Sequence, residues 1–192
     1  MKKKRLAVLG IVAAIGILPV MGFVSQYPPC GGYPDWESSP YVLPYPVGES
    51  YAVWQGNCTW GGHHGPYQYS YDFLMPIGTL VTAARDGVVV DIQDGFRDGE
   101  AVENWVAIEH VDGTVASYSH LHSLLVHIGD HVQAGDSVGL SGNTGQTGGV
   151  PHLHFHLSAC IQPEDCGTLP VTFRNTDPNP GGLVEGVSYE AR

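Results

Sequence analysis

The stretch Pro151-His152-Leu153-His154-Phe155 follows a glycine-rich loop and places two histidines two residues apart. On a β-strand, side chains at positions i and i+2 point to the same face, so both imidazole rings can converge on one point. A β-protein can present a metal ion and a catalytic base together in this way. The stretch therefore predicts a strand whose histidines belong to a metal centre.

Segments upstream supply further side chains of the same chemical kind. His63-His64-Gly65 is followed by Tyr71-Asp72-Phe73, and a later segment reads Tyr118-Ser119-His120-Leu121. Together they contribute imidazoles and one carboxylate, which are ligand types that zinc takes in proteins. The sequence thus offers a set of candidate zinc ligands.

Short β-branched runs alternate with glycine-bearing turns from Leu43 onward. The turn signal Val111-Asp112-Gly113 lies between two of these runs, so the two are expected to pair as a hairpin. No window shows a long amphipathic helix, so the predicted fold class is all-β, mainly antiparallel, with little helix. The expected strands cover residues 80–83, 87–92, 105–109 and 114–118, with a further edge strand at 171–173 and at most one helical turn at 123–127.

The 192 residues have room for one domain with short appendages. Residues 1–22 combine a basic start with an apolar stretch, which predicts a signal peptide cleaved after Gly22. An uncleaved membrane anchor is the alternative, because the apolar stretch approaches the roughly 20 residues that span a bilayer. The expected organisation is then a Pro/Tyr/Gly-rich lead-in at 23–42, the main domain at 43–160, and a C-terminal extension at 161–192 that packs on the domain or trails from it.

The part of the chain after residue 22 is strongly acidic and contains no lysine. Loss of the first 22 residues lowers the Lys+Arg count from 8 to 4 while all 19 acidic residues remain, so the formal net charge changes from −11 to −15. Such a surface is a poor partner for anionic lipid and for DNA or RNA, so no nucleic-acid partner is expected. Contact with a membrane is expected only if the N-terminal segment stays uncleaved, and the oligomeric state is not decided by the sequence.

The four cysteines are expected to form disulfides, because their number is even and the chain carries an export signal. Proximity in the sequence favours a bond between Cys160 and Cys166, which leaves Cys30 to pair with Cys58. Zinc binding by cysteines is disfavoured because no Cys-x-x-Cys spacing occurs. The expected location is the periplasm or the extracellular medium.

The histidine segments belong to a longer ordered series of motifs that covers roughly residues 43–157. This series resembles the lysostaphin-type (LytM-like) zinc metalloendopeptidases, with the blocks in the order of that family. The resemblance implies a groove over an antiparallel sheet, of the duplicated hybrid motif or barrel-sandwich hybrid type. It also implies hydrolysis of peptide bonds in the stems or cross-bridges of peptidoglycan. The blocks include His63-x-Gly65, Tyr71-Asp72-Phe73, Asp86-Gly87-Val88-Val89, Tyr118-x-His120-Leu121, Gly142-Asn143-Thr144-Gly145 and His152-Leu153-His154-Phe155.

Carried over residue by residue, the resemblance implies His63, Asp72 and His154 as ligands of one catalytic zinc ion. Three protein ligands leave the fourth tetrahedral position open, as in catalytic zinc sites. His120 and His152 are then expected to act in acid–base catalysis. One would deprotonate or orient the attacking water, and the other would hydrogen-bond the developing oxyanion.

Four further residues are candidates for supporting a ligand or lining the groove: His64, Tyr118, Asn143 and His156. The His-x-Gly pattern selects His63 over His64 as ligand, because Gly65 lets the chain turn away, and His64 is expected to face solvent. His156 departs from the family, which commonly has an acidic residue there. It shares the strand face of His154, and the alternative is a strand histidine without a role.

Two other functions compete with an active endopeptidase. A non-catalytic relative would bind peptidoglycan or activate another cell-wall hydrolase, but such relatives lose ligands and none is lost here. A biotinyl- or lipoyl-type carrier needs a lysine at a hairpin tip, and no lysine follows Lys4. The motifs leave the cleaved bond open among a stem or cross-link bond, a glycine bridge and a glycine-rich protein.

Overall fold

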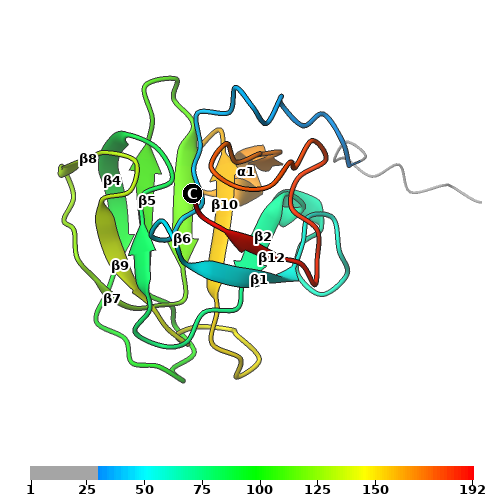
Figure 1. Cartoon of the computed structure of the whole chain (residues 1–192). Coiled ribbons are helices and arrows are strands. Elements are labelled where there is room, and N and C mark those ends of the chain that lie inside the picture. The colour runs from blue at the N-terminus through cyan, green and yellow to red at the C-terminus, as the bar shows by residue number, and fades with distance from the viewer. Residues whose placement is uncertain (1–29) are drawn as a thin grey trace, which may run out of the picture.

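A computed structural model describes residues 30–192 of the chain (Figure 1). The expected signal peptide at 1–22 and the start of the lead-in lie outside the described residues. The described chain is built almost wholly of antiparallel strands, which confirms the all-β prediction. Its helical turns are η1 (Gly65–Tyr67) and α1 (Pro163–Cys166). The strands are β1 (Ser50–Gln55), β2 (Ser70–Phe73), β3 (Leu80–Thr82), β4 (Gly87–Gln93), β5 (Trp105–Glu109), β6 (Val115–Ser119), β7 (Leu121–Leu124), β8 (His131–Val132), β9 (Ser137–Ser141), β10 (Leu153–Ser158), β11 (Thr168–Leu169) and β12 (Ser188–Glu190).

The strands form a large sheet and a small one. The large sheet has the order β12-β1-β2-β10-β6-β5-β4-β8, and β11 pairs with β10 at one end. The small sheet has the order β3-β9-β7. Strands β2, β10, β6 and β5 lie side by side at the centre of Figure 1. The expected hairpin is confirmed, since β5 and β6 pair from Trp105 opposite Ser119 to Glu109 opposite Val115.

Two expected elements differ from the structure. Residues 123–127 contain no helical turn, because β7 occupies Leu121–Leu124 and pairs with β9. Residues 171–173 are buried but do not form an edge strand. The backbone N–H and C=O of Phe173 bond to the side chain of Asn179 instead of to a neighbouring strand. The tail contributes its strands elsewhere, as β11 and β12.

Residues alternate between the two faces of the central strands. In β10, Leu153, Phe155 and Leu157 are buried in the hydrophobic core. The Phe155 ring packs edge-on against Tyr118 of β6 and lies 5.9 Å from Phe173 of the tail. Because successive strand residues point to opposite faces, the histidines between these apolar residues are directed to the other side of the sheet.

Both ends of the described chain are tied to the sheet. The tail buries Val171, Phe173, Tyr189 and Ala191 in the core, and β12 pairs with β1. Disulfides join Cys30 to Cys58 and Cys160 to Cys166, as the cysteine spacing predicted. Across residues 30–192, we find no helix with the length and apolar character needed to cross a membrane.

Candidate metal centre

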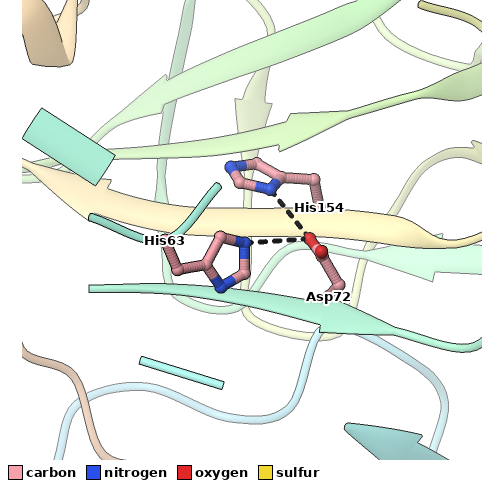
Figure 2. A group of neighbouring side chains, drawn as sticks. All are labelled: His63, Asp72 and His154. Carbon is pink, nitrogen blue, oxygen red and sulfur yellow. Dashed lines mark hydrogen bonds and ion pairs between the residues drawn. The ribbon is translucent and has the colours of Figure 1, made fainter. Parts of the chain in front are cut away.

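His63, Asp72 and His154 come together above the central sheet (Figure 2). Asp72 on β2 and His154 on β10 are direct cross-strand partners. His154 Nδ1 lies 2.8 Å from Asp72 Oδ1, and His63 Nε2 lies 3.2 Å from the same oxygen. One ligand atom from each residue lies within 4.8 Å of the other two. The strand register fixes two members of the cluster, and the loop before η1 delivers the third.

The orientation of His63 is set by the backbone. Its Nδ1 lies 2.9 Å from the carbonyl oxygen of Gly56, and a carbonyl can only accept, so Nδ1 carries the proton. In the neutral ring, Nε2 then points a lone pair at the carboxylate of Asp72. Two acceptors at this distance repel each other unless a proton or a cation lies between them. This buried arrangement fits a metal ion.

The charge state of Asp72 suits the same role. Burial raises the pKa of this carboxyl group, but its interactions with His154 and His63 outweigh burial and hold the pKa well below its usual value. The group is therefore ionised at neutral pH. Two imidazoles and one carboxylate form a nitrogen–oxygen donor set of the kind that zinc binds.

His120 and His152 stand beside this cluster, with their ring centroids 4.7 Å apart. Each is anchored in the same way: Nδ1 of His120 donates to the carbonyl of Thr144 and Nδ1 of His152 to the carbonyl of Val150, both at 2.8 Å. Their Nε2 atoms therefore carry the lone pairs, and that of His152 lies 3.7 Å from Asp72 Oδ1.

Burial keeps both of these rings neutral. Desolvation, followed by the neighbouring His154 and His152, lowers the pKa of His120 to about 3. Desolvation also lowers the pKa of His152, against an opposing effect of Asp72. Two neutral imidazoles thus present acceptor nitrogens next to the candidate metal position.

An open groove of about 920 Å³ runs over these residues. Among the residues that line it, none is a lysine or an arginine. Its rim includes the Tyr67 hydroxyl, which donates to Glu164 of α1 at 2.7 Å and so joins η1 to the segment closed by the Cys160–Cys166 disulfide. The residues that line this groove include His63, Asp72, His120, His152, His154 and His156, together with Trp54, Gln55, Tyr67, Glu103, Ser117, Ser119, residues 145–148 and residues 161–164.

Two groove residues escaped prediction from the sequence. Glu103 places its carboxylate 3.2 Å from His120 Nδ1, and burial raises the pKa of this carboxyl group. Trp54 of β1 packs edge-on against the His152 ring at 5.2 Å. Neither lies in a motif, and only the pairing of Trp105 with Ser119 brings Glu103 near His120. No signal in the local sequence marks them.

Three of the remaining candidate residues lie away from the groove. His64 is exposed, with its ring 6.2 Å from that of Trp60. Tyr118 lies in the core, where its hydroxyl accepts from the backbone N–H of Ala84, because it alternates with the groove-lining Ser117 and Ser119. Asn143 lies in a loop, where its backbone N–H donates to Asp98, and does not line the groove.

The fourth candidate, His156, does reach the site. It is buried at 4% exposure, lines the groove, and places Nδ1 3.3 Å from Nε2 of His154. Its other nitrogen has no hydrogen-bond partner among the described residues. The structure therefore places His156 next to one of the three residues of the candidate metal site.

Comparison with known proteins identifies the family. The model of Peptidase family M23 matches residues 66–165, more than half of the chain. The chain therefore belongs to peptidase family M23. The matched segment contains Asp72, His120, His152 and His154, whereas His63 lies just before it.

Relatives in this family share the central part of the chain. The peptidoglycan DD-endopeptidase ShyA of Vibrio cholerae is 45% identical over 86 residues, which cover 45% of this chain and 19% of ShyA. The glycyl-glycine endopeptidase ALE-1 of Staphylococcus capitis is 36% identical over 113 residues, covering 54% of this chain and 30% of ALE-1. The chain thus spans less than a third of either relative.

A solved structure supports the fold. A mutant of the catalytic domain of the prophage-encoded M23 protein EnpA from Enterococcus faecalis superposes with a TM-score of 0.52 at 24% identity. The match covers 66% of this chain and 93% of that domain. The likeness shows that the two chains share a fold.

Proposed function

We propose that this M23 family member is an exported zinc-dependent endopeptidase that hydrolyses peptide bonds in peptidoglycan. The observation that carries the proposal is the convergence of His63 Nε2, Asp72 Oδ1 and His154 Nδ1 at the floor of an open groove, with His63 and Asp72 buried and His154 partly buried. Acceptor atoms that face one another repel unless a proton or a cation lies between them. No lysine or arginine lines the groove to supply positive charge, so a metal ion fits this position.

His63, Asp72 and His154 would hold the zinc ion, and three protein ligands leave a position open for substrate or water. When bound, zinc supplies Lewis-acid polarisation of the scissile carbonyl. The chain prepares the ligands in advance. The Gly56 carbonyl orients the His63 ring, and the cross-strand register holds Asp72 against His154.

His120 and His152 would handle the protons of hydrolysis. Both rings present an Nε2 lone pair, so either can accept the proton of the attacking water as its oxygen bonds to the carbonyl carbon. The C–N bond then breaks, and the proton passes from the imidazole to the leaving amine nitrogen. To donate to the developing oxyanion, the partner imidazole must first take up a proton from solvent at Nε2, and it returns that proton to solvent when the oxyanion collapses.

The substrate class follows from the relatives and from the groove. ShyA is named a peptidoglycan DD-endopeptidase and ALE-1 a glycyl-glycine endopeptidase, so both relatives cut peptide bonds. The open groove over the histidines can take an extended peptide. Cross-linked peptides of peptidoglycan are the substrate we propose.

Location outside the cytoplasm has support from two features. Residues 1–22 have the composition of an export signal, and the described residues contain two disulfides. Disulfides persist in oxidising compartments, so the periplasm or the extracellular medium fits. The alternative of a non-catalytic relative is less well supported, since every ligand and acid–base position is filled.

The test is digestion of purified sacculi by the exported protein, with mass analysis of the released peptides. Sacculi with direct cross-links and sacculi with glycine bridges are compared, because the two relatives differ in this respect. We expect new peptide ends in one wall type, and none from His154→Ala, which should also lose most of its zinc. Full zinc occupancy in His154→Ala would contradict the ligand assignment, and uncut sacculi of both types would contradict the substrate.

A further inference from the structure

His156 is a buried polar residue on the groove face of β10. Strand alternation places it beside His154 and opposite the core residues Phe155 and Leu157. Its cross-strand partners are Ser70 of β2 and Ser117 of β6. Nothing in the acid–base scheme above uses it.

We propose that His156 is a positioning residue that accepts a hydrogen bond from His154 and thereby strengthens zinc binding. The inference rests on the proposed function, because it assumes that His154 is a zinc ligand. The contact that carries it is the 3.3 Å distance between His156 Nδ1 and His154 Nε2.

The two nitrogens of His154 have separate tasks in this arrangement. Nδ1 faces Asp72 at 2.8 Å and is the atom available to the metal. A metal takes the lone pair of Nδ1, so the proton of the neutral ring must sit on Nε2. Nε2 then needs an acceptor, and His156 Nδ1 is the nitrogen in front of it.

The proton of His156 is placed by the same logic. If Nδ1 accepts, the proton of His156 must sit on Nε2. That atom is buried and has no hydrogen-bond partner among the described residues. A buried N–H without a partner destabilises a fold, so His156 is a poor choice for packing alone. Its contact with His154 is therefore a reason for a histidine at this position.

An apolar residue at position 156 could provide the packing that β10 needs there. His156 is surrounded by the Tyr67 ring at 5.6 Å and the His154 ring at 5.4 Å. An apolar side chain of similar size would remove the buried partnerless N–H and also the acceptor.

The experiment compares His156→Leu with His156→Asn in the full-length exported protein. Leu and Asn have similar size and branching, but the Asn side-chain oxygen occupies about the position of Nδ1 and can accept. Zinc affinity is measured by competition with a chromogenic chelator. We expect His156→Leu to lose about 10- to 100-fold in zinc affinity. His156→Asn should recover most of the loss.

Thermal unfolding separates positioning from packing. Without metal, His156→Leu should melt at the same temperature as the parent protein or higher, and its gain in melting temperature on zinc addition should be smaller. His110→Leu is the matched control. His110 is also buried, and its Nε2 has no hydrogen-bond partner within residues 30–192, but its Nδ1 donates to the backbone carbonyl of Asp86, outside the groove. Its zinc affinity should not change.

The outcomes distinguish this inference from the proposed function. Equal zinc affinity in the parent and His156→Leu would overturn the positioning role and leave the ligand set intact. Equal loss in His156→Leu and His156→Asn, with lower metal-free stability in both, would show that His156 only packs. If zinc binding does not depend on His154, the proposed function itself fails. Nitrogen-15 NMR of the zinc-loaded protein should also find His156 protonated at Nε2, and protonation at Nδ1 would contradict the hydrogen bond.

Discussion

The two faces of β10 differ in what their side chains contact. On one face, Phe155 packs against Tyr118 and Phe173 in a core of apolar side chains. On the other face, His154 meets Asp72 from the next strand and His63 from a loop. The core face is complete once the strands pair, whereas the histidine face also needs loop carbonyls and a cation. The packing that stabilises the fold and the residues of the candidate site therefore lie on opposite sides of the same six residues. We expect that each side can be changed without the other.

Removal of the metal should separate the two faces most clearly. We expect a strong chelator to reduce peptidase activity by on the order of 10³-fold or more, because the carbonyl loses its Lewis acid. The far-UV circular dichroism should stay unchanged, since the core face holds the sheet. Added zinc should restore activity. Loss of the β-sheet signal on chelation would show that the metal is structural.

Truncation of a side chain on the core face should lower stability but leave zinc binding by the folded protein unchanged. Phe155→Ala removes a fully buried ring between Tyr118 and Phe173 and should destabilise the fold by about 3–5 kcal/mol. Urea unfolding measures this change. The fraction that remains folded should keep its zinc stoichiometry, and a specific loss of zinc from folded protein would mean that the two faces are coupled.

Substitution of His120 or His152 should lower turnover without changing zinc content or stability. His120→Ala and His152→Ala should each lower kcat by about 10²-fold, because a positioned imidazole contributes this much to proton transfer or oxyanion stabilisation. Zinc content and melting temperature, measured on the same samples as controls, should stay close to those of the parent protein. A variant with normal turnover would remove that histidine from the mechanism.

In the metal-free protein, acid should lower the free energy of unfolding through the histidines of this face. The pKa of His120 falls to about 3 in the fold and those of His152 and His156 are also lowered, while an unfolded histidine titrates near 6.5. The unfolded state therefore binds more protons below about pH 6.5, so stability is lost as pH falls from there toward the folded pKa values. Each such histidine contributes a slope of about 1.4 kcal/mol per pH unit.

This slope is measured by unfolding at pH 7.5, 6 and 4.5. His120→Ala should show a shallower loss than the parent protein, because one histidine with a lowered pKa is gone. Asp72 has little effect in this range, since its pKa is lowered and its unfolded value lies near 3.9. Equal slopes in both proteins would contradict a neutral, buried His120.

The sequence predicted the strands and the site residues unequally well. The hairpin at 105–118 was predicted because its turn signal and its β-branched runs are local. The failed edge strand at 171–173 has a non-local cause, since Asn179 takes the backbone groups of Phe173. Tyr118 was a candidate only because it adjoins His120 in a motif, and strand alternation places it in the core.

The sequence by itself determined the all-β fold class and the list of histidines and carboxylates from which a site can be built, and it favoured the two disulfide pairings that the structure contains. These depend on side-chain period, turn chemistry and motif order, which are properties of short segments. The family resemblance supplied the ligand set His63, Asp72 and His154, but only the tertiary structure decided the distances between these residues and which other residues meet them. It placed His63 beside Asp72 through the Gly56 carbonyl, Glu103 beside His120 through the pairing of β5 with β6, and His156 behind His154. Such contacts depend on register and loop paths between distant segments, and no local pattern encodes those distances.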